Sequence, residues 1–294
     1  MAELCGEACR GSGARAAVGP LRIAFALSSA VFLAEVAGGL WFSSLALLAD
    51  AAHMAVDLAA LGLALFAAWA AARPPDLKRS FGYHRVEVLA ALANGVGLWI
   101  TVGVLLREAW DRLGRPHPVQ VQGMLSVAVL GLLCNLASAA VLYRGAKESL
   151  NLRAVLLHAA SDALGSLGAI AAGLVIWRTG WLAADPLATA FICVVISLAS
   201  WGLVRDATHI LLEGTPEHID PAAVNAALAG VGGVMEVHDL HLWSLSSGRE
   251  SMSGHLVVTP GRDPLAVRKA AAKLLEERFA LAHVTLQTEA PEDA

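Results

Sequence analysis

Two segments of the sequence carry the same pair of metal-binding residue types at the same spacing. His53 and Asp57 are four residues apart, and so are His158 and Asp162. On a helix, residues at this spacing lie one turn apart on the same face, so each segment would present one imidazole beside one carboxylate. Two such helices facing each other would offer two nitrogen and two oxygen donors around one point.

These four donors suit a tetrahedral Zn²⁺ site with bonds of about 2.0–2.2 Å. A donor set that includes imidazole favours Zn²⁺ or Co²⁺ over Mg²⁺ and Ca²⁺, which prefer oxygen alone. Metal binding at such a site releases protons, and loss of the metal leaves two carboxylates close together, which favours proton binding. A site that opened alternately to each side of a membrane would therefore exchange Zn²⁺ for H⁺. The alternative is that each His–Asp pair is a hydrogen bond that holds a helical bundle together.

The chain that must position these segments is unusually apolar. Of its 294 residues, 57% are hydrophobic and 16% are charged, whereas a soluble domain carries about 25% charged residues. The formal net charge of −4 argues against a nucleic-acid partner, which calls for a basic surface. The composition therefore predicts a protein of the lipid bilayer.

Six stretches approach the length of roughly 20 apolar residues that a membrane-spanning helix needs. We expect six transmembrane helices near residues 23–42, 45–71, 86–106, 124–143, 154–177 and 186–204. The first His–Asp pair falls on the second span and the other pair on the fifth. A charge at the centre of a bilayer costs at least about 2.5–3.5 kcal/mol, so these residues need a partner or a function.

Basic residues near the span ends predict the orientation. If the N-terminus is inside, eleven Lys and Arg lie on the inner side and four on the outer side. The more basic side is the cytoplasmic one, so we expect both termini in the cytoplasm. The first 20 residues lack the apolar core of a signal peptide. Short loops without an organellar targeting segment favour the cytoplasmic (inner) membrane of a bacterium, with the membrane of an intracellular vesicle as the alternative.

The sequence after residue 212 predicts a small cytoplasmic α+β domain. We expect helices near 221–230 and 263–279 and strands near 234–245, 251–259 and 282–289. This αββαβ order is typical of a ferredoxin-like unit. The expected organisation is thus a cytoplasmic tail over 1–20, a six-helix transmembrane domain over 21–212 and a cytoplasmic domain over 213–294.

Four motifs, in this order, resemble the cation diffusion facilitator family and its zinc-transporting branch. They are the first His–Asp pair, the segment SFGYHRVEVL (80–89), the second His–Asp pair and the segment VHDLHLWS (237–244). The resemblance covers about residues 20–290. It implies a homodimer, alternating access, proton-coupled Zn²⁺ efflux and a metallochaperone-like cytoplasmic domain. It also implies that His53, Asp57, His158 and Asp162 are the transport ligands.

The resemblance further implies Zn²⁺ bound as a structural or regulatory ion in the cytoplasmic domain. The matching positions are His238, His255 and His283, with Glu289 as a further candidate. All three histidines fall on predicted strands, where ligands from adjacent strands can converge. His241 lies in the opposite phase to His238, so we expect its side chain on the other face of the sheet.

Five other residues are candidates at or near metal sites. His84 lies in a loop where the family can form an interface site, and Cys5 and Cys9 could donate thiolates across a dimer. The alternative for the two cysteines is a reduced pair without metal. Asp50 lies about one turn before His53 and could tune that site from a second shell. Asn135, in the fourth span, resembles a position that the family uses near the transport site.

Two other functions would use the same ligands. An intramembrane zinc hydrolase needs an open coordination position and a general base, but the chain has no His-Glu-x-x-His motif and four ligands would close the metal shell. A membrane metal sensor that signals through its cytoplasmic domain would leave the duplicated pair without a purpose. We therefore expect a secondary active transporter of Zn²⁺ and H⁺, not an enzyme.

Overall fold

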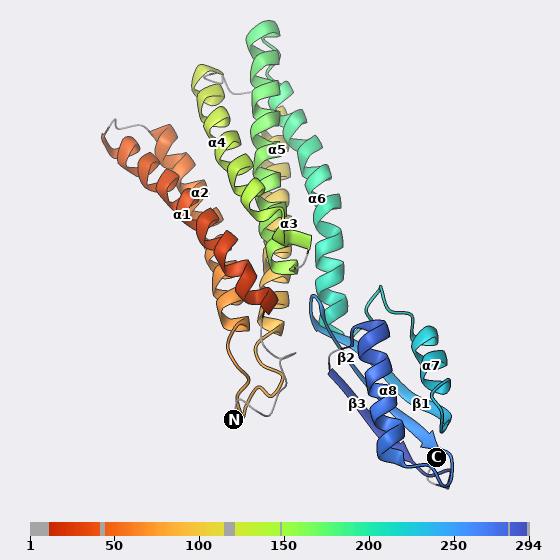
Figure 1. Cartoon of the computed structure of the whole chain (residues 1–294). Helices are drawn as coiled ribbons and strands as arrows, with labels where there is room; N and C mark the ends of the chain where they lie inside the picture. The colour runs from red at the N-terminus through yellow and green to blue at the C-terminus, as the bar shows by residue number, and fades with distance from the viewer. Residues whose placement is uncertain (1–11, 42–44, 115–120, 148, 282, 293–294) are drawn as a thin grey trace. The chain divides into compact units, whose positions relative to one another are not determined.

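The computed structural model describes residues 12–41, 45–114, 121–147, 149–281 and 283–292 (Figure 1). Within these ranges, some side chains of the first, second and fourth helices fall outside the description. The chain divides into two compact units. Residues 11–73 and 86–207 form a helical unit, and residues 74–85 and 208–294 belong to an α+β unit.

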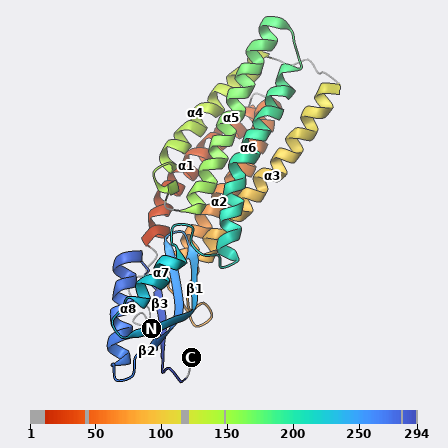
Figure 2. The same cartoon turned by 90° about the vertical axis from the view of Figure 1, so that its right-hand side faces the viewer.

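The helical unit is built from long helices that run side by side (Figure 2). They are α1 (Ser12–Trp41), α2 (Leu45–Ala71), α3 (Arg85–Gly114), α4 (Val121–Leu142), α5 (Leu150–Thr179) and α6 (Ala184–Leu211), with a short 3-10 helix, η2 (Gly145–Lys147), before α5. Helix α1 begins inside the expected N-terminal tail. Ala14, Arg15, Ala16 and Ala17 favour this extension, because alanine and arginine have high helix propensity.

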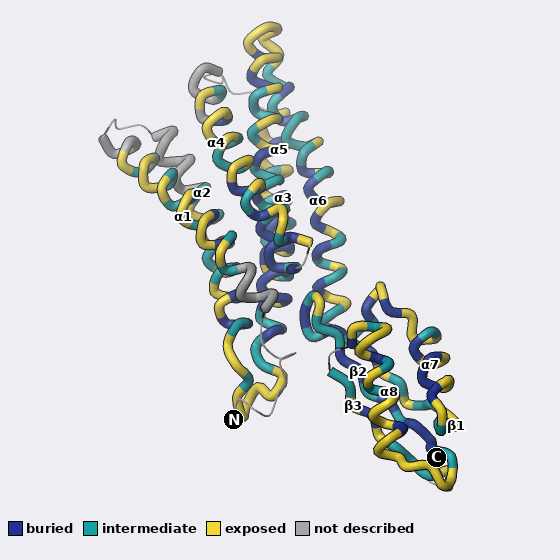
Figure 3. Tube along the Cα trace, viewed as in Figure 1, coloured by how far each residue is buried: buried dark blue, intermediate teal, exposed yellow. Residues whose placement is uncertain are grey.

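Apolar side chains cover the outside of the helical unit. Exposed positions recur along the helices (Figure 3), and Leu130, Phe191 and Leu198 are 64%, 70% and 74% exposed. Helices α3, α5 and α6 are long and apolar enough to cross a membrane. In the described parts of α1, α2 and α4 the apolar stretches are shorter, at Val18–Ala34, Asp57–Ala71 and Ala128–Leu142.

Four of the helices share a buried seam. Helix α2 packs on α1 and α5, and α4 packs on α1 and α5. The seam is lined by Ala64 and Ala68 of α2 and by Leu152 and Val155 of α5. Small residues at such a seam let helix backbones approach closely, so side chains from α2 and α5 can meet.

Both ends of α5 are capped. Ser149 is the N-cap and accepts a hydrogen bond from the backbone N–H of Leu152 at 3.4 Å. The same hydroxyl donates to Glu87 Oε1 on α3 at 2.8 Å. Gly180 ends the helix in the left-handed conformation with φ 71°, which glycine adopts without steric cost. These contacts fix the helix that carries His158 and Asp162.

The α+β unit has the element order expected from the sequence. It contains α7 (Pro221–Ala229), β1 (Val234–Ser246), β2 (Arg249–Val258), α8 (Pro264–Phe279) and β3 (His283–Glu289). Strand β1 pairs antiparallel with β2, and β2 pairs parallel with β3, in the order β1-β2-β3. Asp220 and Asp263 cap the two helices, and each is followed by a proline in the first turn, as is common at helix starts.

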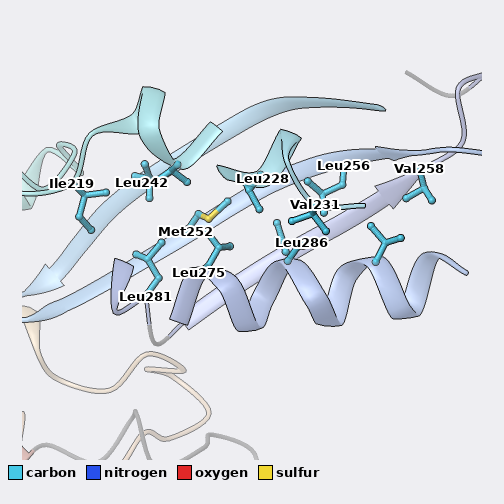
Figure 4. Packing of buried hydrophobic residues seen from close by; sticks show 13 residues of the cluster. Ile219, Leu228, Val231, Leu242, Met252, Leu256, Val258, Leu275, Leu281 and Leu286 are labelled. Atoms are coloured by element: carbon cyan, nitrogen blue, oxygen red, sulfur yellow. The ribbon is translucent and has the colours of Figure 1, made fainter. Parts of the chain in front are cut away.

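The core of this unit lies between the sheet and its two helices (Figure 4). Leu242, Met252 and Leu286 from the strands meet Leu228 of α7 and Leu275 of α8. Because successive strand residues point to opposite faces, the residues between these core positions lie on the other face of the sheet. That face carries His238 and His255, which pair directly across β1 and β2.

Candidate metal sites

The helical unit brings three of the predicted transport ligands together. His158 Nε2 on α5 lies 2.9 Å from Asp57 Oδ1 on α2 and 3.7 Å from Asp162 Oδ2, one turn further along α5. The three side chains are only 17–18% exposed. Donor atoms around a tetrahedral Zn²⁺ with bonds of about 2.0–2.1 Å lie about 3.3 Å apart. The three donors therefore already have the spacing of a metal site.

A second contact holds α2 and α5 in this register. Asn151 Nδ2 on α5 donates to the backbone oxygen of Ala64 on α2 at 2.7 Å, and Asn151 is fully buried. Asn151 lies seven residues before His158, and Ala64 lies seven residues after Asp57. Seven residues are two helical turns, so both contacts belong to one antiparallel packing of the two helices. The sequence does not mark Asn151, since no motif signals a hydrogen bond to a distant backbone carbonyl.

Of the other residues predicted at this site, the structure describes the side chain of Asn135 but not those of His53 and Asp50. His53 and Asp50 lie on α2, one and about two turns before Asp57, but their side chains are outside the described part of the structure. Asn135 is half-buried on α4. A Cβ on Gly131 would lie 3.3 Å from Ser166 Oγ, so these two positions face each other across α4 and α5. One turn from that contact on each helix, Asn135 is level with Asp162.

The α+β unit brings together a second group of three donors. His238 on β1 and His255 on β2 converge on Glu289 of β3. His238 Nε2 lies 3.1 Å from Glu289 Oε2, and His255 Nδ1 lies 2.8 Å from Glu289 Oε1. The carboxylate is only 10% exposed, so it is available to a cation with little competition from water. We call these three residues the cytoplasmic cluster.

The expectation for His241 is wrong, because β1 contains a bulge. Between His238 and His241 the chain advances three residues, while the partner strand advances only two, from His255 to Ser253. Asp239 sits at the bulge with φ 48°. The extra residue shifts the alternation by one position. His241 therefore lies on the same face of the sheet as His238 and His255.

The bulge also brings two unpredicted donors beside the cytoplasmic cluster. Asp239 Oδ1 lies 2.9 Å from His241 Nε2, and Asp239 Oδ2 lies 3.7 Å from His255 Nε2. The one signal in the sequence is the His-Asp-x-His order of residues 238–241. It indicates a shared face only when the bulge is known.

The structure does not bring His283 to the cytoplasmic cluster. His283 pairs with Ser251 at one end of β2, whereas Gln287 pairs with His255. Four residues along a strand correspond to about 13 Å. The His283 ring instead makes an edge-to-face contact with Phe81, with ring centroids 5.3 Å apart.

His84 is buried in the α+β unit, 4% exposed. Burial, with a smaller contribution from the positive charge of Arg249, lowers the pKa of His84 to about 4. The guanidinium charge opposes a second cation at this histidine, and His84 belongs to neither of the two three-donor groups found among the described residues. Cys5 and Cys9 lie outside the described residues.

Two protein families match the chain, one for each region. The cation efflux transmembrane domain matches residues 21–212, and the cytoplasmic domain of cation efflux proteins matches residues 216–291. Together they cover nearly the whole sequence.

Bacterial relatives match over 92% of the chain. The metal cation efflux system protein CzcD of Cupriavidus metallidurans is 41% identical, and the match covers 85% of that protein. The cadmium, cobalt and zinc/H⁺-K⁺ antiporter of Bacillus subtilis is 38% identical over 88% of its length. The zinc transporter ZitB of Escherichia coli is 37% identical over 86% of its length.

One solved structure also matches part of the chain. It is the metal-bound C-terminal domain of the CzcD transporter from Cupriavidus metallidurans, with 33% sequence identity and a TM-score of 0.23. The match covers 24% of this chain and 99% of the chain in the solved structure.

Proposed function

Since the chain belongs to the cation diffusion facilitator family, whose members are membrane cation efflux transporters and not enzymes, we propose that it exports Zn²⁺ from the cytoplasm in exchange for H⁺. The observation that carries the proposal is the convergence of Asp57, His158 and Asp162 between α2 and α5. Two carboxylates and neutral imidazole balance the charge of a divalent cation. The relatives named as transporters of zinc, cadmium and cobalt support the choice of metal.

His53 is the proposed fourth ligand. It lies one helical turn before Asp57 on α2, as Asp162 lies one turn after His158 on α5, so the pair on each helix follows the same i, i+4 geometry. Four protein ligands close the coordination shell of Zn²⁺. Zn²⁺ then dissociates when protons replace it on the ligands, which is the basis of the exchange.

The Asp57–His158 contact gives the exchange a physical route. The same His158 nitrogen that would bind the metal lies within hydrogen-bond distance of a carboxylate oxygen. A proton between these two atoms and a metal between them exclude each other, because both use the same lone pairs. Proton entry at this contact therefore weakens the metal, and metal binding expels the proton.

We propose that the helical unit spans the membrane six times, with both termini and the α+β unit in the cytoplasm of a bacterium. The match of the transmembrane family across all six helices supports six spans. The excess of basic residues on one side supports the orientation, and the bacterial relatives support the inner membrane.

In the cytoplasm, the α+β unit would form a ferredoxin-like dimerisation domain over residues 213–294. Its αββαβ order and the matched cytoplasmic domain of cation efflux proteins support this assignment. The cytoplasmic cluster of His238, His255 and Glu289 would hold a structural or regulatory Zn²⁺.

Zn²⁺ uptake into inside-out proteoliposomes tests the transport site. We expect Asp57→Asn and Asp162→Asn to lower the rate at least about tenfold, since each removes a charge from the metal shell. Asp111→Asn, which changes an exposed carboxylate on α3 outside the proposed transport site, should retain wild-type Zn²⁺ flux.

Two results would contradict the proposal. Wild-type Zn²⁺ flux in both Asp57→Asn and Asp162→Asn would place the transport site elsewhere. Wild-type protein that binds Zn²⁺ but moves none across the bilayer would favour a sensor.

A further inference from the structure

The exposed pair Asp239 and His241 lies directly beside the cytoplasmic cluster. The two side chains are 55% and 64% exposed, and their donor atoms are 2.9 Å apart. Neither residue was expected to face the cluster, because the bulge in β1 decides their direction. A non-glycine residue in the left-handed region is uncommon, and such conformations gather at functional sites.

The five side chains form an alternating series of imidazoles and carboxylates. Along the face of the sheet the order is His241, Asp239, His255, Glu289 and His238. The exposed fraction of the side chains falls from 64% at His241 to 55% at Asp239, 29% at His255 and 10% at Glu289, and His238, on the far side of Glu289, is 33% exposed. Along this descent, neighbouring donor atoms lie 2.9, 3.7 and 2.8 Å apart. Such short steps let a cation hold one donor while it reaches the next.

His255 connects the two ends of the series through its two ring nitrogens. Nδ1 lies 2.8 Å from Glu289 in the cytoplasmic cluster, and Nε2 lies 3.7 Å from Asp239 outside it. A neutral imidazole has one free lone pair, so His255 can bind a metal on one side at a time. A change of tautomer therefore switches His255 from the outer pair to the inner carboxylate.

We propose that His241 and Asp239 are an entry pair, which receives a divalent cation such as Zn²⁺ or Co²⁺ from water and passes it through His255 to the cytoplasmic cluster. The proposal rests on the metal site proposed above for that cluster. A hydrated cation must lose water before it reaches a carboxylate that is 10% exposed. The exposed Asp239 and His241 replace part of that water first, so the cation is never stripped without compensation.

An entry pair has a distinctive kinetic signature. It lowers the barrier for the passage of the cation in both directions, so its removal slows association and dissociation by the same factor. The equilibrium dissociation constant then stays constant. A ligand of the bound state behaves differently, because its loss chiefly raises the dissociation rate and weakens affinity.

The test is stopped-flow Co²⁺ binding to the full-length protein in detergent. The Asp57→Asn/Asp162→Asn background silences the transport site, and the visible absorption of tetrahedral Co²⁺ reports the cytoplasmic cluster. Association is followed after mixing with Co²⁺, and dissociation after mixing with excess chelator. His241→Ala is the main variant because it changes no formal charge at neutral pH, and Asp239→Asn is the second.

We expect both rates to fall about tenfold in each variant, in the range that charged and polar groups at an entry mouth typically control, with the dissociation constant unchanged within about twofold. The matched control is His218→Ala. His218 is 68% exposed and lies 3.8 Å from Glu250, so it resembles His241 in exposure and in having a carboxylate neighbour. Its loss should leave both rates as they are.

Two results would overturn the entry pair. If His241→Ala weakens affinity while association stays fast, His241 is a ligand of the bound metal. If neither rate changes, cations reach the cluster by another route. A different result would show that the cytoplasmic cluster does not bind the metal. The Co²⁺ signal would then persist in His238→Ala, or it would be missing from protein with intact His238, His255 and Glu289.

Discussion

In the proposed exchange, Asp57 is the residue at which the metal and the proton compete most directly. Its Oδ1 lies 2.9 Å from His158 Nε2 across the α2–α5 seam, and Asp162 approaches the same nitrogen from one turn away. A proton and a divalent cation at this point would compete for the same lone pairs. We therefore propose that the chemistry of exchange is concentrated in these three side chains, with His53 as the fourth.

His84 provides a prediction about stability and pH. Its pKa is lowered from 6.5 to about 4, chiefly by burial and then by Arg249. Between these two values the unfolded chain binds a proton that the folded chain does not. Stability therefore rises with pH across this window and is lost as the pH falls from 6.5 toward 4. We expect His84→Gln to weaken that dependence.

The measurement compares melting temperatures of full-length protein in detergent at about pH 5 and about pH 7.5, on either side of the usual range in which histidine titrates. The wild-type protein should lose more stability at the lower pH than His84→Gln does. His218→Gln, which changes an exposed histidine, serves as the control. Equal losses in wild type and His84→Gln would show that His84 is not a source of the pH dependence.

At the scale of elements, the site depends on how α2 and α5 meet. Asp57–His158 and Ala64–Asn151 are two contacts of one antiparallel seam, two helical turns apart. In the proposed mechanism the first contact opens when the metal enters, while the second uses a backbone oxygen that is not among the proposed ligands. Asn151 can therefore hold the register of the two helices while the ligands rearrange.

Asn151→Ala tests this role. We expect a loss of about 1 kcal/mol of stability, the usual net value of a buried hydrogen bond, and a fall in Zn²⁺ affinity at the transport site because the ligands are less well aligned. Zn²⁺ titration in the His238→Ala background, together with a melting curve, gives both numbers. Ser138→Ala is the control, since the buried Ser138 hydroxyl has no hydrogen-bond partner among the described residues. Unchanged Zn²⁺ affinity in Asn151→Ala would refute the positioning role.

The elements themselves were largely predictable, but their pairing was not. Long apolar runs marked the helices, and the strands of the α+β unit begin and end within a few residues of the expected positions. The bulge at Asp239 depends on one backbone conformation, which an alternating pattern does not encode, so His241 was assigned to the wrong face. The position of His283 depends on the register of β3 beside β2, which is set by packing after the α8 crossover.

The whole molecule joins two units whose surfaces suit different surroundings in one chain. The chain passes between them after residues 73, 85 and 207. Low charge and an apolar exterior suit the helical unit to lipid, while the α+β unit has a conventional core. The duplicated His–Asp spacing predicted the first candidate metal site, because both pairs follow helical geometry, and three of its four residues lie together. The cytoplasmic cluster joins three strands, so the sequence named His238, His255 and Glu289 only through the family resemblance and included His283, which the register of β3 places elsewhere.

Coupling between Zn²⁺ and H⁺ flux can be measured by recording both ions at once in proteoliposomes. One dye reports Zn²⁺ and another reports pH, each on the same sealed vesicles. We expect that Zn²⁺ entering the vesicle drives H⁺ out, that an opposing proton gradient slows Zn²⁺ uptake, and that both signals disappear together in Asp57→Asn. Zn²⁺ flux with no accompanying proton movement, and no response to the gradient, would contradict this coupling.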